Sequence, residues 1–146
     1  MNFFRPVDQY PPYAGRNDIE YLFRSLNAEQ VIDIFIALLL EKKVLLISKY
    51  KALLTHASVA LVSFLFPLYW MHNFIPILPL SMMGVIESPF PYFIGIDPNI
   101  LKECDQGQFE IPNDVYRVDL DSGYISLRDS NPKVPSKEYK QLKQRI

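Results

Sequence analysis

The sequence predicts an α/β fold, with a doubly wound and mostly parallel sheet that helices flank on both faces. Short apolar runs without alternation, such as Val44–Ile47, are typical of strands that are covered on both faces. Helical patterns alternate with these runs along the chain, as they do when crossover helices join parallel strands. At 146 residues, the chain is long enough for one domain with its own core.

The N-terminal part is predicted to contain an arm and two helices. Residues 1–18 hold three prolines between polar and aromatic residues, which indicates an extended linker or arm. A short helical turn is expected at residues 19–24. The next helix runs to about Glu41 and begins with a capping box, in which the side chains of Asn27 and Gln30 accept each other's backbone N–H. Its apolar residues lie nearly all round, so we expect it to be buried on most sides.

Alternating strands and helices are predicted for the rest of the chain. Ser48 ends the Val44–Ile47 strand and is expected to cap a helix over residues 50–66. Pro76 lies within the second predicted strand and has no N–H to donate, which indicates an edge strand or a bulge. The remaining predicted elements are that strand (residues 74–78), a short helix (81–87), a strand (Tyr92–Ile96), a helix after the Asp97 cap and Pro98 (to about Cys104), and two strands (115–120 and 124–127).

A membrane-spanning helix is the alternative for residues 59–80, which are nearly all apolar and long enough to cross a bilayer. Three prolines would interrupt that helix, and His72 and Asn73 would lie near its middle. Backbone groups freed by proline are costly in lipid unless neighbouring helices satisfy them. The sequence therefore favours the buried core of a soluble domain.

Composition limits the classes of partner and compartment. The net charge of −1 gives no electrostatic basis for binding nucleic acid, whose protein ligands are usually strongly basic. The single cysteine, Cys104, excludes an intramolecular disulfide and favours a reducing compartment. The first residues lack a charged-then-apolar leader, so we expect a cytoplasmic protein.

Few residues are candidates for chemistry, and we predict no catalytic, cofactor-binding or metal-binding residue. Neither a dinucleotide-binding nor a phosphate-binding glycine loop occurs in the sequence. His56, His72 and Cys104 lack the short spacing of a zinc site. His72, close to Trp70, can act as a general base, but a partly buried core residue with a hydrogen-bond partner is the favoured interpretation.

Two charged features have alternative interpretations. Asp119 and Asp121 can bind a divalent cation or share a proton. The favoured interpretation is a strand end and a turn, in which Asp121 makes a local hydrogen bond. Basic residues in the tail can contact an anionic membrane, although the solvated face of a truncated helix is favoured. These tail residues are Lys133, Lys137, Lys140, Lys143 and Arg145.

Several stretches of the chain resemble the central module of DENN domains. The most specific are FPLYWMHNFIPILP (residues 66–79), SPFPYFIGID (88–97) and VDLDSG (118–123). LLLEKKVLLIS (38–48) resembles the passage from helix to strand in that module, and LFRSL (22–26) resembles its entry. Together the stretches cover about residues 20–127, in the order and at the spacing of the family.

The resemblance implies both an architecture and a function. Residues 19–127 would form the Rossmann-like central DENN module, residues 1–18 the linker from an upstream longin-like module, and residues 128–146 a linker and the start of a downstream helical module. DENN domains are guanine nucleotide exchange factors for Rab-type small GTPases in membrane traffic. The expected partners are therefore a Rab GTPase and the two neighbouring modules, with at most peripheral recruitment to membranes.

The position of the Rab-binding residues follows from the predicted sheet, not from the resemblance. In open α/β sheets, ligand-binding loops lie beyond the carboxyl ends of the strands. This rule nominates Ser48, Lys49, Tyr50, Lys51, Pro79, Leu80, Ser81, Met82, Asp97, Pro98 and Asn99 as partner-binding residues. The stretches that resemble the family are mainly core-forming, so Tyr69, Trp70, Pro79 and Gly95 are expected to be structural.

Two further functions remain open from sequence. One is a DENN-like scaffold without exchange activity, and the other is a small Rossmann-like enzyme that uses Asp119 and Asp121 with a metal. The 49% hydrophobic content also predicts exposed apolar surface and self-association of the chain. A monodisperse monomer at high concentration, measured by light scattering, would contradict self-association.

Overall fold

A computed structural model describes residues 15–103, 109–126, 131–133 and 135–145. The predictions for residues 1–14 and for Cys104 lie outside the described residues. The elements in chain order are α1 (Arg16–Ser25), α2 (Ala28–Leu39), β1 (Val44–Ile47), α3 (Lys51–Ser63), β2 (Asn73–Ile75), the 3₁₀ helix η2 (Leu80–Glu87), β3 (Tyr92–Ile96), α4 (Pro98–Glu103), β4 (Tyr116–Asp119), β5 (Tyr124–Ile125) and α5 (Ser136–Arg145).

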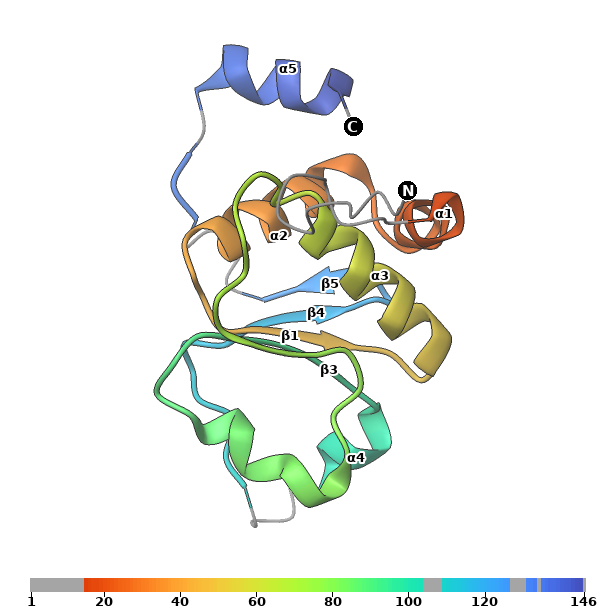
Figure 1. The fold of residues 1–146 in the computed structure, drawn as a ribbon, viewed down its shortest axis with the longest axis vertical. Coiled ribbons are helices and arrows are strands. Elements are labelled where there is room, and N and C mark those ends of the chain that lie inside the picture. The colour runs from red at the N-terminus through yellow and green to blue at the C-terminus, as the bar shows by residue number, and fades with distance from the viewer. Residues whose placement is uncertain (1–14, 104–108, 127–130, 134, 146) are drawn as a thin grey trace, which may run out of the picture.

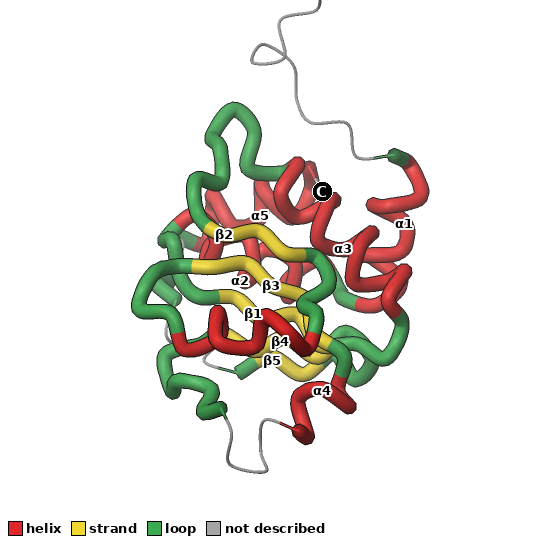
Figure 2. The backbone as a smooth tube through the Cα atoms, turned by 60° about the horizontal axis from the view of Figure 1, so that its bottom comes forward, coloured by secondary structure: helices red, strands yellow, loops and turns green. Residues whose placement is uncertain are grey.

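The five strands form one sheet in the order β2-β3-β1-β4-β5, which Figure 2 shows from one side. The first four strands in this order run parallel, and β5 pairs antiparallel with β4. Val44 of the central strand β1 lies opposite Phe93 on one side and Tyr116 on the other. The predicted α/β class with a mostly parallel sheet is confirmed.

Helices cover both faces of the sheet, as predicted. In Figure 1, α1, α2 and α3 lie on one side of the strands, whereas η2 and α4 lie on the other. Side chains of β1 alternate between the two layers, because successive residues of a strand point to opposite faces. Val44 and Leu46 belong to the core under α1, α2 and α3, and Leu45 belongs to the core that includes Met83 and Ile86 of η2. No helix among the described residues has the length and apolarity to cross a membrane.

The bounds of the first two helices agree only in part with those predicted from the sequence. The capping box of α2 is present as predicted: Asn27 Oδ1 accepts the Gln30 N–H, and Gln30 Oε1 accepts the Asn27 N–H, both at 2.9 Å. The first helix begins at Arg16, earlier than predicted, and the Asp18 carboxylate accepts the Gly15 N–H at 2.7 Å. Helix α2 ends at Leu39, before the predicted end, because Glu41 adopts a left-handed backbone conformation with φ of 53°.

The second strand is shorter than predicted and begins earlier. It spans Asn73–Ile75, whereas residues 74–78 were expected. Pro76 ends it, since proline cannot donate to the ladder. The expected edge position is confirmed, because β2 pairs only with β3 in the described sheet. Beyond the strand, the chain passes so close to β3 that a Cβ on Gly95 would lie 1.9 Å from the Pro76 carbonyl oxygen.

Several other element boundaries differ from the predictions. Helix α3 begins at Lys51 with Tyr50 as its N-cap, so the predicted cap at Ser48 is wrong. The helix ends at Ser63, before the predicted end. The segment predicted as a short helix is a 3₁₀ helix (η2), and β4 and β5 are both shorter than expected. Within η2, Met82 departs from helical backbone angles (φ −112°, ψ 16°), so the segment is kinked.

Candidate functional site

The three nominated segments follow the carboxyl ends of β1, β2 and β3, which are neighbours in the sheet. The Ser48 N–H donates to the Ile96 carbonyl at 3.2 Å, and the Leu78 N–H donates to the Gly95 carbonyl at 2.7 Å. These bonds hold the starts of the first two segments at the end of β3, which the third segment follows directly. In Figure 1 this side of the sheet lies to the right, where α3 and α4 begin. We call residues 48–51, 79–82 and 97–99 the docking edge; their contact with a partner stays a prediction.

The residues of the docking edge are exposed, half-buried or completely buried. Tyr50, Leu80 and Met82 are 58%, 55% and 45% exposed, so large apolar side chains are available to a partner here. Lys49 places its Nζ 5.0 Å from the centre of the Tyr50 ring. Lys51, Pro79, Ser81 and Asn99 are also exposed, whereas Asp97 and Pro98 are half-buried. Ser48 is completely buried and cannot contact a partner directly.

The buried Ser48 hydroxyl donates to Asp121, which was predicted to make a hydrogen bond within its own turn. Its Oγ–H donates to Asp121 Oδ1 at 2.8 Å, and the Lys49 N–H donates to Asp121 Oδ2 at 2.9 Å. The prediction of a local turn bond for Asp121 is therefore wrong. Asp119 makes the local turn instead, because its Oδ1 accepts the N–H groups of Asp121 and Ser122. The two aspartates at the end of a predicted strand were the only signal in the sequence for these hydrogen bonds. The residues that donate to Asp121 depend on which strand lies next to β4.

The hypothesis of a metal-dependent enzyme finds little structural basis. Both carboxylate oxygens of Asp121 already accept hydrogen bonds from Ser48 and Lys49, in the segment that follows β1. Among the described residues, no group of three or more His, Cys, Asp or Glu side chains could hold a metal ion. A pair of carboxylates that accept several backbone N–H groups is suited to fixing loops.

The two histidines have different surroundings. His56 of α3 places Nδ1 2.5 Å from Asp18 Oδ1, and its ring stacks on Tyr21 of α1 at 4.8 Å. It therefore joins α3 to α1. His72 was expected to be hydrogen-bonded in the core, but within the described part of the chain its buried Nε2 has no hydrogen-bond partner. This Nε2 lies 3.3 Å from Glu41 Oε1, within ion-pair distance, and the ring meets Trp70 edge-on.

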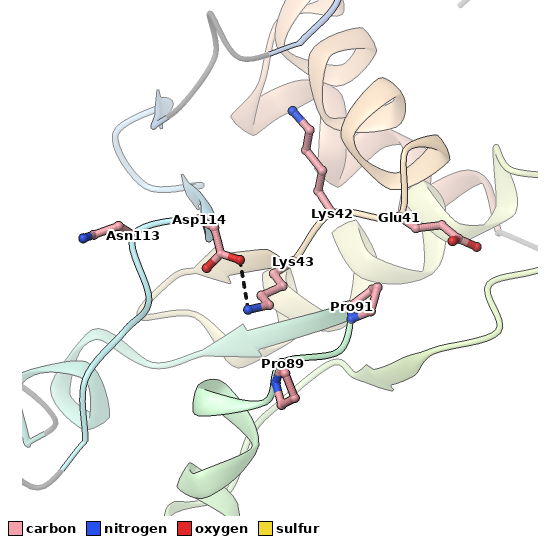
Figure 3. Close-up of a pocket in the computed structure, with 7 residues that line it drawn as sticks. All are labelled: Glu41, Lys42, Lys43, Pro89, Pro91, Asn113 and Asp114. Carbon is pink, nitrogen blue, oxygen red and sulfur yellow. Dashed lines mark ion pairs between the residues drawn. The ribbon is translucent and has the colours of Figure 1, made fainter.

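The opposite edge of the sheet carries a pocket of about 510 Å³ that the sequence did not indicate. Figure 3 shows that two of its lining residues, Lys43 and Asp114, form an ion pair, with Nζ and Oδ2 3.0 Å apart. Pro89 and Pro91 line it next to Lys43. We call this region the amino edge, since Lys43, Pro91 and Asp114 lie just before β1, β3 and β4. The charges of Lys43 and Asp114 neutralise each other here.

A buried tyrosine lies close to the amino edge. Tyr92, the first residue of β3, is fully buried and its hydroxyl donates to the Ile86 carbonyl at 3.0 Å. Burial raises the pKa of the Tyr92 phenol above its ordinary value, and the Asp114 carboxylate raises this pKa further, whereas Arg117 lowers it. The charged form of a phenol is disfavoured in an apolar environment and beside a negative charge. Tyr92 is therefore a neutral hydrogen-bond donor of the core.

A second exposed apolar region lies beside the edge strand β2. It consists of Phe66, Leu68, Tyr69, Met71 and Phe74, which are between 37% and 82% exposed. The Trp70 indole donates to the Asn73 carbonyl at 3.1 Å, and its ring packs edge-on against Phe93. Together with Pro76, this bond hinders the pairing of another strand with β2. Trp70 thus has the structural role expected of it, whereas Tyr69 is more exposed than that role requires.

Comparison with known proteins identifies related chains. The family model for the DENN (AEX-3) domain matches residues 1–123. DENN domain-containing protein 2B of Mus musculus is 38% identical over 92 residues, which cover 63% of this chain and 8% of that protein. DENN domain-containing protein 2C of Mus musculus is 37% identical over 92 residues, covering 63% of this chain and 10% of that protein. Elicitor of plant defense protein 1 of Gibberella zeae is 32% identical over 139 residues, covering 94% of this chain and 12% of that protein.

These relatives are far longer than this chain, which spans between 8% and 12% of their length. The match to the family model nevertheless extends over most of the chain, from the first residue to the turn after β4. It includes the whole docking edge and both aspartates of the turn. The chain therefore belongs to the DENN domain family.

Proposed function

We propose that this chain is part of a guanine nucleotide exchange factor, which promotes the release of GDP from a Rab-type small GTPase in membrane traffic. Membership of the DENN family supports this function. The docking edge would contribute part of the surface that binds the GTPase. An upstream longin-like module and a downstream helical module would complete that surface in the longer protein.

The mechanism requires differential binding and no covalent chemistry. An exchange factor binds the nucleotide-free GTPase more tightly than the loaded one, and this difference in binding free energy drives nucleotide release. The docking edge offers apolar side chains for such contacts, on segments that strands β1, β2 and β3 hold in place. Since the strands position these segments before binding, less conformational freedom is lost in the complex.

One observation carries the proposal. Tyr50, Leu80 and Met82 come from two segments that are far apart in the sequence, yet both segments lie at the same edge of the sheet. Large apolar side chains that gather on an exposed surface are typical of protein-binding sites. The edge is also where ligands bind in open α/β sheets.

The direct test is the release of a fluorescent guanine nucleotide from a panel of purified Rab GTPases. The chain is assayed alone and in a form extended by longin-like and downstream helical modules. We expect the extended form to accelerate release from one or a few Rabs, and the chain alone to do so less. Release by EDTA, which removes the magnesium ion, serves as the control that each Rab is loaded and competent.

The possible outcomes separate the two regulatory hypotheses. Acceleration by the extended form supports exchange activity, and the share produced by the chain alone measures how much of the surface lies in it. If neither folded form accelerates release from any Rab, the exchange function is wrong. The DENN-like scaffold without exchange activity would then be the better description.

A further inference from the structure

One carboxylate fixes the conformation of the first segment of the docking edge. Asp121 Oδ2 accepts the Lys49 N–H, and Oδ1 accepts the Ser48 hydroxyl, although Lys49 and Asp121 are 72 residues apart in the sequence. The Ser48 Oγ in turn accepts the Tyr50 N–H at 3.0 Å. Two consecutive backbone N–H groups are therefore held, one by the carboxylate directly and the other through the serine hydroxyl.

The turn that carries Asp121 is itself anchored. Asp119 Oδ1 accepts the Asp121 N–H at 2.9 Å, and the Gly123 N–H donates to the Asp119 carbonyl at 2.8 Å. Gly123 has a φ of 73°, a left-handed conformation that glycine adopts without strain. The Gln30 side chain of α2 donates to the Gly123 carbonyl at 2.5 Å. The carboxylate thus has a fixed position before any partner arrives.

The backbone groups that this carboxylate and Ser48 hold lie directly before α3, which begins at Lys51. The first N–H groups of a helix have no partner within the helix, and the N-cap Tyr50 supplies no side-chain hydrogen bond for them among the described groups. A negative charge near a helix N-terminus is also favourable. Because Ser48 is completely buried, its hydroxyl is oriented by Asp121 and the Tyr50 N–H and not by solvent.

We propose that Asp121 is a positioning residue for the docking edge: through Ser48 and the Lys49 N–H, it holds Lys49 and Tyr50 in the conformation that binds the GTPase. This inference rests on the proposed function. Both oxygens of the carboxylate already accept hydrogen bonds from Ser48 and Lys49, so Asp121 acts through this segment. Its effect is preorganisation, which reduces the ordering cost of binding.

The test compares Asp121→Ala and Asp121→Asn with the unmodified chain. The first readout is hydrogen exchange at the Lys49 and Tyr50 amides, which needs no GTPase. In Asp121→Ala we expect exchange at both amides to be roughly tenfold faster, with amides of β1 unchanged. Asp121→Asn retains one acceptor oxygen, so its effect is expected to be intermediate.

The second readout is exchange activity on the responsive Rab, measured with the extended form. We expect Asp121→Ala to lower kcat/KM roughly tenfold, mainly through a higher KM, because the segment must be ordered on binding. Asp121→Asn should recover part of this loss. Asp114→Ala is the matched control, since it removes a carboxylate at the amino edge and is expected to leave kcat/KM unchanged. Thermal unfolding of each variant verifies that it is folded.

Each outcome decides between the two proposals. Unchanged amide exchange in Asp121→Ala overturns the positioning role, whatever the activity. Faster amide exchange with unchanged kcat/KM overturns it as well, because the conformation would then not matter for binding. If the unmodified extended form is inactive on all Rabs, the proposed function itself is refuted, and the docking role of Asp121 with it. Should Asp121→Ala fail to fold, the same two measurements on Asp121→Asn decide. Unchanged amide exchange or unchanged kcat/KM in that variant would then overturn the positioning role.

Discussion

The two edges of the sheet use charged side chains in opposite ways. At the docking edge, the carboxylates of Asp119 and Asp121 accept backbone N–H groups and the Ser48 hydroxyl. At the amino edge, Lys43 and Asp114 form an ion pair, and both residues line a pocket. Tyr50, which follows the bound Ser48 and Lys49, is 58% exposed.

Under the proposed function, the first arrangement shapes a binding surface, whereas the second contributes to stability. Hydrogen bonds from a carboxylate to backbone N–H groups fix the path of a loop, and therefore the side chains that it presents. An ion pair at a strand start neutralises two charges but leaves the loop shape unspecified. We therefore expect changes at the docking edge to lower activity and changes at the amino edge to lower stability alone. The following experiments test this division.

The largest effect is expected from Gly95→Ala, where the docking edge depends on close packing. The new Cβ would lie 1.9 Å from the Pro76 carbonyl oxygen, so the backbone must move. We expect the free energy of unfolding in urea to fall by about 3 kcal/mol, at the upper end of overpacking effects. Gly84→Ala is the matched control, because nothing lies within 4 Å of its Cβ and the expected change is within about 0.5 kcal/mol. Equal stabilities of the two variants would contradict the close approach.

The next effect concerns the exposed side chains of the docking edge. Replacing Tyr50 and Leu80 together by alanine should lower kcat/KM for nucleotide exchange by about 10- to 30-fold, since apolar anchors of an interface carry much of its binding energy. Both side chains are more than half exposed, so the melting temperature should stay nearly unchanged. The control is the pair Phe90→Ala and Tyr124→Ala, which are 70% and 65% exposed outside the docking edge. A similar loss in the control pair would exclude a specific role of this edge.

A smaller effect follows from the buried phenol at the start of β3. Because the pKa of Tyr92 is raised in the folded state, the folded chain keeps the proton above pH 10, where an exposed tyrosine loses it. The contribution of Tyr92 to stability is therefore complete below about pH 10 and falls above it, by about 1.4 kcal/mol for each pH unit. Tyr92→Phe has no phenol to ionise. Above pH 10, its free energy of unfolding should therefore fall less steeply with pH than that of the unmodified chain. Parallel stability curves above pH 10, measured by urea unfolding, would show that the phenol titrates normally.

The smallest effect is expected at the amino edge. Asp114→Ala removes the carboxylate that pairs with the largely buried Lys43, and the free energy of unfolding should fall by about 1 kcal/mol. The cost is modest because Asp114 itself is mostly exposed and the pair is screened by solvent. Nucleotide exchange should remain unchanged. A loss of exchange activity without a loss of stability would reverse the distinction between the two edges.

Sequence reasoning located the candidate site only as far as strand ends could be predicted. The rule for open sheets nominated the segments after β1, β2 and β3, and the structure places all three at one edge. The rule could not show that Ser48 is buried whereas Tyr50, two residues later, is exposed. Exposure depends on how α3 leaves the sheet, and no local pattern specifies that direction.

Features that depend on neighbours along the chain could be predicted before the fold was known. The capping box of Asn27 and Gln30 was predictable because its partners are three residues apart. The continuous apolar run Val44–Ile47 indicated a strand covered on both faces, and Pro76 indicated an edge strand or a bulge, since each follows from burial or backbone hydrogen bonding.

Contacts between groups that are distant in the sequence could not be predicted in this way. Asp121 binds Ser48 and Lys49, and Lys43 pairs with Asp114, because β4 lies next to β1 in the sheet. A local pattern predicts that an aspartate accepts a hydrogen bond, but not from which residue. The partner is set by strand order and register, which the packing of the whole core determines.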